Sequence, residues 1–220
     1  MDSPKRVYVD FDDVLSETAR AITEVVAERF DKRVPFEDLK HYDLDKSFGL
    51  TRPELADLMG LLHQPEMLSA MAVVDSAAAV LDEWTRQGCS ICVVTGRPPS
   101  SVKASLEWLG RNGIGFEEVI FVDKYGRSPD THGGIRAWSL DELKRESFCL
   151  AVEDSPDMAD FLADTMGVPV ALLDQPWNAG RCAAAEAGGR LVRCFGWDEV
   201  KKRFPSPGAA QGIPAGAACA

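Results

Sequence analysis

Four short apolar runs of the sequence are each followed by residues that can do chemistry. In chain order these residues are Asp10-Phe11-Asp12-Asp13, Thr95-Gly96-Arg97, Asp123-Lys124 and Glu153-Asp154-Ser155. Carboxylates that gather in one place repel one another, so a site of this composition usually holds a hard cation. Mg²⁺ suits it, because this ion needs few protein carboxylates and completes its octahedron with water and substrate phosphate. The sequence therefore predicts a Mg²⁺ site.

The apolar runs themselves predict strands of a parallel sheet. Each is nearly continuous rather than alternating, as expected of strands that are covered on both faces. The five runs are Arg6–Asp10, Ser90–Thr95, Glu118–Val122, Phe148–Val152 and Val168–Leu173. Segments with helical periodicity lie between them, at Thr18–Phe30, Ala77–Arg86 and Val102–Asn112. This alternation predicts an α/β fold with a doubly wound, Rossmann-like parallel sheet, whose ligands lie beyond the carboxyl ends of the strands.

The connection between the first two strands predicts an inserted subdomain. About 80 residues separate Asp10 from Ser90, far more than a simple crossover needs. We therefore expect residues 1–15 and 73–204 to form the α/β core and residues 16–72 to form a small helical cap. The end of the chain, 205–220, is rich in Pro, Gly and Ala and predicts a flexible tail.

The composition argues against several classes of protein. A formal net charge of −11 disfavours a binder of duplex nucleic acid and disfavours capture at anionic membranes. Apolar runs fall short of the roughly 20 residues of a membrane span, and the start of the chain has no signal-peptide pattern. Cys89 and Cys92 form a C-x-x-C inside a predicted strand, which favours buried thiols over a redox or zinc site. We expect a reduced, cytoplasmic environment.

These motifs resemble the haloacid dehalogenase superfamily in its phosphatase form. D-F-D-D-V after the first strand is similar to the family's first motif, the Thr of V-V-T-G-R to its second, and E-D-S after F-C-L-A-V to its fourth. A closer resemblance is to the 5′-nucleotidase and 5′(3′)-deoxyribonucleotidase branch. It is carried by D-F-D-D-V-L-S-E-T, H-Y-D-L-D-K-S-F-G-L, E-E-V-I-F-V-D-K and L-L-D-Q-P-W-N.

The resemblance implies a role for each catalytic residue. Asp10 would attack phosphorus as a nucleophile, because a carboxylate is already ionised at neutral pH. Asp12 would protonate the leaving alcohol and then activate water, which requires a raised pKa. Thr95 would bind the transferring phosphoryl oxygens together with nearby amides. The resemblance also implies a magnesium site that holds the ion through Asp10, the carbonyl of Asp12, Asp154, and Glu153 or Asp157.

Two groups of residues leave alternatives open. The phosphate-binding lysine is either Lys124, which follows the third strand directly, or Lys144, on a short predicted helix. Arg97 either binds substrate phosphate beside Gly96 or caps a helix.

In the cap, Tyr42 and Phe48 either stack on a nucleobase or belong to the cap core. Trp177 and Asn178 are either a packed aromatic residue and a turn residue or a pair of site residues.

Three functions follow from these patterns. The first is a phosphomonoesterase of the nucleotidase type, with a nucleoside monophosphate as its small-molecule partner and Mg²⁺ as its cofactor. The second is a phosphatase of sugar phosphates or other small metabolites, and the third is a catalytically silent binding protein. The presence of Asp10, Asp12, Thr95 and Asp154 together argues against the third. We expect a monomer or homodimer that binds neither duplex nucleic acid nor membranes.

Overall fold

The computed structural model describes residues 5–62, 64–124, 126 and 131–208 of the 220-residue chain. Its centre is a six-stranded sheet in the order β3-β2-β1-β6-β7-β8, in which every neighbouring pair is parallel. The strands are β1 (Lys5–Asp10), β2 (Cys89–Thr95), β3 (Glu118–Phe121), β6 (Leu150–Glu153), β7 (Val170–Leu173) and β8 (Leu191–Cys194). The predicted α/β fold with a parallel sheet is confirmed.

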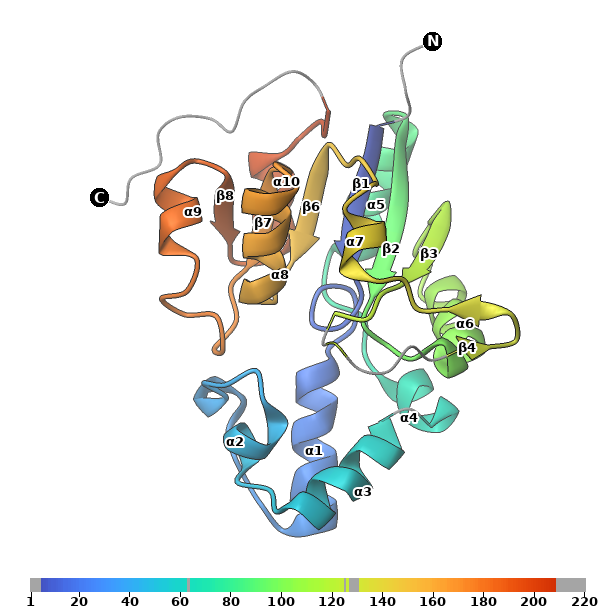
Figure 1. Ribbon diagram of the computed structural model, residues 1–220, viewed down its shortest axis with the longest axis vertical. Coiled ribbons are helices and arrows are strands. Elements are labelled where there is room, and N and C mark those ends of the chain that lie inside the picture. The colour runs from blue at the N-terminus through green and yellow to red at the C-terminus, as the bar shows by residue number, and fades with distance from the viewer. Residues whose placement is uncertain (1–4, 63, 125, 127–130, 209–220) are drawn as a thin grey trace.

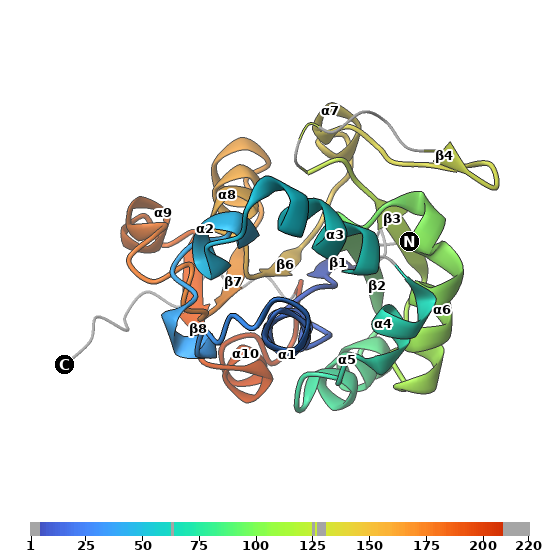
Figure 2. The same cartoon turned by 90° about the horizontal axis from the view of Figure 1, so that it is seen from below.

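Helices cover both faces of this sheet (Figures 1 and 2). Val7 and Val9 of β1 face one hydrophobic cluster, whereas Tyr8 between them faces the other, because side chains alternate along a strand. The first face is covered by α5 (Ala77–Arg86), α6 (Val102–Arg111) and α10 (Trp197–Arg203). The opposite face is covered by α7 (Leu140–Leu143), α8 (Pro156–Asp160) with the helical turn η3 (Phe161–Thr165), and α9 (Ala183–Ala187). Burial on both faces explains the continuous apolar runs.

The long connection between β1 and α5 is helical. It contains α1 (Thr18–Phe30), η1 (Phe36–Asp38), α2 (Leu44–Phe48), α3 (Arg52–Leu62) and α4 (Pro65–Ala70). In Figure 1 the carboxyl ends of the strands point towards these helices. The two connections to the sheet run side by side, since Ser16 pairs with Val73 in an isolated bridge and the Glu17 amide donates to the Ala72 carbonyl. This pairing supports a division into core and cap near 16 and 72, which we keep as a proposal.

Sequence patterns missed some elements at the edges. The edge strand β8 was not predicted, because its central residues Val192 and Arg193 are half-buried and Arg193 interrupts its apolar pattern. The small antiparallel pair β4 (Thr131–His132) and β5 (Ile135–Arg136) and the connector η2 (Pro99–Ser101) were also not predicted. Most of the predicted tail lies outside the described residues. Its described part, 205–208, includes a buried Pro207 whose carbonyl accepts from the Cys89 thiol.

No helix of the described residues is both long and apolar enough to cross a membrane.

Candidate active site

Asp10 is the last residue of β1 and lies in a buried group of charges. One of its carboxylate oxygens lies 2.6 Å from the Lys124 ammonium, which itself lies 3.3 Å from Glu153. Oxygens of Asp10, Glu153 and Asp154 come within 4.8 Å of one another. Burial, and next the charge of Glu153, raises the pKa of Asp10 well above its usual value, and Lys124 opposes this rise. Three buried carboxylates with one ammonium leave an excess of negative charge.

The donor set of this group fits a hard cation. Asp154, directly after β6, has one carboxylate oxygen, Oδ2, that accepts from the Trp177 indole N–H at 2.9 Å. Its other oxygen, Oδ1, is buried and has no hydrogen-bond partner among the described residues. Burial, followed by the charges of Glu153 and Asp10, raises the pKa of Asp154. An unpartnered buried carboxylate oxygen is costly unless a cation or a proton compensates it, so the observation fits a bound divalent ion.

Glu153 differs from its two neighbours because both its oxygens are occupied. Oε2 accepts from the Tyr8 hydroxyl at 2.8 Å and from Lys124, and Oε1 accepts from the amides of Asp154 and Ser155. Glu153 therefore fixes the strand end and Lys124. The oxygens that remain best placed for a cation are those of Asp10 and Asp154.

Asp12 corrects one expectation from the sequence. Its carboxylate pairs with the guanidinium of Arg97, with the Nη2–Oδ1 distance at 2.7 Å, and also accepts from the Thr18 hydroxyl at 2.7 Å. Burial alone would raise the pKa of Asp12, but the charge and hydrogen bonds of Arg97 outweigh it, so the pKa is lowered. The expected rise in the pKa of Asp12 is therefore wrong for this arrangement, because sequence spacing did not reveal the arginine.

Arg97 is held on several sides rather than left open to a substrate. Its guanidinium carbon lies 3.7 Å from the centre of the Phe11 ring, and its side chain is 4% exposed. Its backbone amide donates to the Thr95 hydroxyl at 3.1 Å. Thr95 is fully buried at the end of β2 and is not among the residues that line the cavity described below, whereas Gly96 and Arg97 are. The phosphate-binding roles of these three residues stay predictions.

The two candidate lysines lie in very different places. Lys124 has a side chain that is 2% exposed and contacts Asp10, whereas Lys144 is an exposed residue at the end of α7. This geometry supports Lys124. Asp157 is exposed and pairs with Arg181, so the structure does not bring it to the carboxylate group. Asp13 has a positive φ of 58° and accepts from the Ala19 amide, as is common for Asp in a turn.

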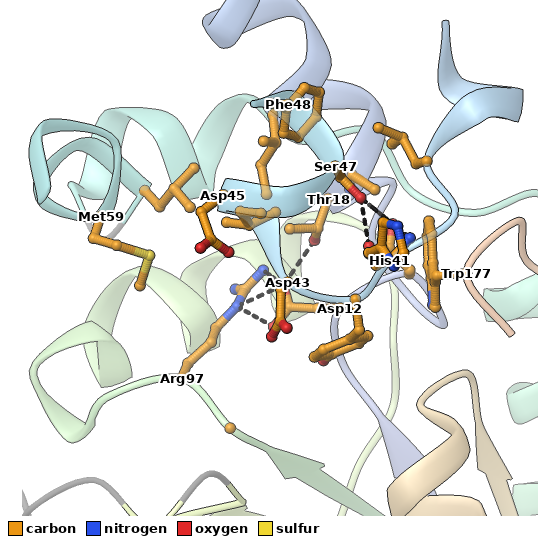
Figure 3. A pocket seen from close by; sticks show the side chains of 18 of the residues that line it. Asp12, Thr18, His41, Asp43, Asp45, Ser47, Phe48, Met59, Arg97 and Trp177 are labelled. Atoms are coloured by element: carbon orange, nitrogen blue, oxygen red, sulfur yellow. Dashed lines mark hydrogen bonds and ion pairs between the residues drawn. The ribbon is translucent and has the colours of Figure 1, made fainter. Parts of the chain in front are cut away.

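A cavity of about 700 Å³ lies between this group and the helices α1–α4. Figure 3 shows Asp12 and Arg97 facing each other at its base, with Phe48 and Met59 on the helical side. The apolar part of its wall comes from α1, α2, α3, α4 and the segments beside them, with Ile22, Leu39, Leu44, Phe48, Leu55, Met59, Leu62, Leu68 and Met71. The volume lies within the usual range of a small-molecule site.

The two predicted aromatic contacts of the cap both line this cavity. Tyr42 lies in the loop before α2 and is 41% exposed. Phe48 is 4% exposed and belongs to the hydrophobic cluster of the helical segment. Phe48 therefore belongs to the core of the helical segment and also lines the cavity, so its removal would disturb the packing of the segment. Stacking of Phe48 or Tyr42 on a nucleobase stays a prediction.

Trp177 and Asn178 are the site residues that sequence reasoning undervalued. The indole of Trp177 binds Asp154, and the Asn178 amide donates to the backbone carbonyls of Asp154 and Leu173, both at 2.8 Å. Trp177 is a packed aromatic residue and Asn178 lies in a turn, as one reading of the sequence expected, and both also touch the carboxylate group. The available signal was the L-L-D-Q-P-W-N phrase, which follows a strand and therefore reaches the same edge of the sheet.

Solved structures share the fold of the whole chain. One is a tyrosine kinase A of Mycobacterium tuberculosis, 16% identical, with a TM-score of 0.62 over 92% of this chain and 98% of that one. Another, 17% identical with a TM-score of 0.57, is a haloacid dehalogenase family hydrolase of Deinococcus radiodurans with bound phosphate and sodium, and it covers 93% of this chain and 96% of that one. At these identities the likeness concerns the fold.

Two curated relatives match most of the sequence, and both carry the name "Putative nucleotidase". The relative from Halalkalibacterium halodurans is 27% identical over 90% of this chain and 91% of its own length. The relative from Bacillus subtilis is 21% identical over 68% of this chain and 70% of its own length.

The family comparison covers more than half of the chain. Residues 5–127 match the family described as "5' nucleotidase, deoxy (Pyrimidine), cytosolic type C protein". The match includes β1 with Asp10, the whole helical segment, and β2 and β3 up to Lys124. The chain belongs to this 5′-nucleotidase family, a group of phosphatases within the haloacid dehalogenase superfamily.

Proposed function

We propose that this protein is a Mg²⁺-dependent phosphomonoesterase that hydrolyses nucleoside 5′-monophosphates through a phosphoryl group carried on Asp10. The observation that carries the proposal is the buried group of Asp10, Glu153 and Asp154 beside Lys124, at the base of a cavity with an apolar wall. Membership of the family supports the reaction class. Mg²⁺, held through Asp10 and Asp154 with the carbonyl of Asp12, would neutralise part of the charge of the carboxylates and of the bound phosphate.

In the first half of the reaction a carboxylate oxygen of Asp10 attacks phosphorus, and the bond to the leaving oxygen breaks. Lys124 holds Asp10 by one oxygen, so its other oxygen remains for the attack. The same ammonium offers positive charge to the equatorial phosphoryl oxygens. Thr95 and the amides after β2 would bind these oxygens as well.

In the second half Asp12 takes a proton from water, which attacks the phosphorus and frees Asp10. Arg97 and Thr18 hold Asp12 in its ionised form, which suits this base step. The first half needs the opposite form, because the leaving oxygen must receive a proton. Protonation of Asp12 therefore requires that the substrate loosens its pair with Arg97, for example by drawing the guanidinium towards the phosphate.

The charges around the cavity support a neutral leaving group. The lining residues that segment 16–72 contributes include Asp43 and Asp45 but, among those described, neither Lys nor Arg. Arg97 and Lys124, which also line the cavity, are paired with Asp12 and Asp10. Asp43 pairs with Lys46, whereas the structure gives Asp45 no ion pair among the described residues. A second anionic group, such as another phosphate or a carboxylate, would therefore be repelled by Asp45. A nucleoside fits this surface, since its faces are apolar and its edges are polar.

Replacing the nucleophile should abolish turnover. We expect Asp10→Asn to fold but to lose about a thousandfold or more in kcat, because an amide neither attacks phosphorus nor holds a cation well. Asp164→Asn serves as a control, because Asp164 is half-exposed and its ion pair within the described part of the chain is with Arg190 at the surface. Retention of even a tenth of the wild-type rate by Asp10→Asn would contradict the mechanism. Beryllium fluoride with Mg²⁺ should form a complex on Asp10, and a crystal structure of the treated protein would test this.

The metal requirement gives a separate test. Removal of divalent ions with a chelator should stop hydrolysis, and added Mg²⁺ should restore it. Asp154→Ala should raise the Mg²⁺ concentration needed for half-maximal rate more than it raises KM for the nucleotide, because Asp154 offers a free oxygen to the ion. The same titration of Asp164→Ala should match wild type. Full activity in excess chelator would be incompatible with the proposal.

The two lysines can be ranked by mutation. Lys124→Ala should lower kcat by about a hundredfold, because it removes a buried positive charge beside the reacting group. Lys144→Ala should change kcat less than twofold, because this side chain is at the surface. Steady-state rates at saturating Mg²⁺ distinguish the two. A larger loss for Lys144→Ala would reassign the lysine while leaving the role of Asp10 intact.

The substrate can be identified with a panel of phosphomonoesters. Nucleoside monophosphates, with deoxyribose forms preferred, should exceed sugar phosphates and nucleoside diphosphates in kcat/KM. Tyr42→Ala should raise KM for the best nucleotide about tenfold, as expected for the loss of a stacked base, and leave p-nitrophenyl phosphate hydrolysis nearly unchanged. Phe195→Ala, at an aromatic residue that is 76% exposed, is the matched control. If small sugar phosphates proved the best substrates, the metabolite phosphatase would replace the nucleotidase.

A further inference from the structure

Trp177 makes two contacts that join separate parts of the molecule. Its indole N–H donates to Oδ2 of Asp154 at 2.9 Å. Its ring packs in the hydrophobic cluster of the helical segment, together with residues such as Ile22 and Phe48, and is 7% exposed. By sequence Trp177 belongs to the loop after β7, but by packing it belongs to helices α1–α3.

The first contact leaves one oxygen of Asp154 free for a cation. With Oδ2 held by the indole, the unpartnered Oδ1 is the oxygen that remains available beside Asp10 and Glu153. The backbone of Asp154 is held as well, because its carbonyl accepts from the Asn178 amide. Asn178 in turn accepts from Arg193 at 2.7 Å, so the loop that carries Trp177 is anchored to β8. This loop therefore limits how the carboxylate can turn.

The second contact ties the indole to the helical segment. The ring of Phe36, in η1, meets the ring of Trp177 edge-on, with centroids 5.9 Å apart and planes at 79°. The guanidinium carbon of Arg20, on α1, lies 4.0 Å from the centre of the Phe36 ring, which is within the range of a cation–π pair. A displacement of the segment from the strand ends would thus move the ring whose N–H fixes Asp154.

From these contacts we propose that Trp177 is a positioning residue that couples the cation site to closure of segment 16–72 over the cavity. The indole holds Asp154 in the orientation that binds the ion, and the ring transmits the position of the segment. Binding of the ion and closure of the segment then favour each other, because such coupling is reciprocal. The proposal rests on the proposed function only in taking Asp154 as a ligand of Mg²⁺.

The test uses Trp177→Phe in the full chain, which removes the N–H donor and keeps a ring beside Phe36. Titration calorimetry of the metal-free protein with Mg²⁺ should give a Kd about tenfold higher than wild type, as is usual when a residue that orients a metal ligand is lost. At saturating Mg²⁺ its kcat should return to within a few-fold of wild type. Trp84→Phe is the matched control, because it removes another buried indole donor, which binds the Phe204 carbonyl far from the site.

Hydrogen exchange tests the coupling itself. In wild type, Mg²⁺ should slow exchange of amides in residues 36–62, and Trp177→Phe should lose most of this protection. Phe36→Leu, which keeps the indole N–H, should also lose protection and raise the Kd for Mg²⁺ a few-fold. It also serves as the test if Trp177→Phe does not fold.

Two results would overturn the proposal. One is a folded Trp177→Phe protein whose Kd for Mg²⁺ lies within twofold of wild type. The other is a Phe36→Leu protein whose Kd for Mg²⁺ and whose protection from hydrogen exchange by Mg²⁺ are both the same as in wild type. Either would leave the proposed hydrolysis untouched. Conversely, Trp177→Phe could weaken Mg²⁺ binding as expected while the wild-type protein hydrolyses no phosphomonoester. That result would overturn the proposed function alone.

Discussion

Mutual repulsion among the buried carboxylates of Asp10, Glu153 and Asp154 is the constraint on which the rest of the site depends. Three such groups within 4.8 Å of one another cannot all be ionised without nearby positive charge. The fold brings them together because two parallel strands, β1 and β6, are neighbours and end at the same edge of the sheet. Lys124 supplies part of the compensation, and a divalent ion would supply the rest. Charge balance at this edge therefore links the fold to its chemistry.

The same constraint explains why so many polar groups around the site are already paired. Arg97 compensates Asp12, and Glu153 has donors on both oxygens. Each such pair lowers the free energy of burying a charge that the chemistry needs. Among the described residues, Asp154 Oδ1 is the buried side-chain oxygen without a hydrogen-bond partner, and it is therefore well suited to bind a cation.

The sheet could be predicted from the sequence because its strands are buried on both faces and read as continuous apolar runs. The residues at the strand ends could be predicted for the same reason, since parallel strands deliver them to one edge. Edge strand β8 could not, because Arg193 and half-burial weaken its apolar pattern. Arg97 and Asp12, which form an ion pair, are 85 positions apart in the sequence. Trp177 and Asp154, which form a hydrogen bond, are 23 positions apart. The position of these residues after strands brings them to one edge of the sheet but does not say which of them pair, so the lowered pKa of Asp12 and the bond from the indole could not be predicted.

The two parts of the cavity contribute different properties. The strand ends provide almost all of its paired charges, whereas helices α1–α4 provide most of its apolar wall and two further carboxylates. On the proposed function, chemistry and selectivity would reside on separate segments of the chain, so a change in the helical segment would alter which leaving group is accepted without disturbing Asp10. Such a division would need a connection, because a cation site assembled before the helical segment is in place would act on a leaving group that the segment has not yet contacted. Trp177 is suited to this task, since it touches a carboxylate of the strand ends and is packed among the helices.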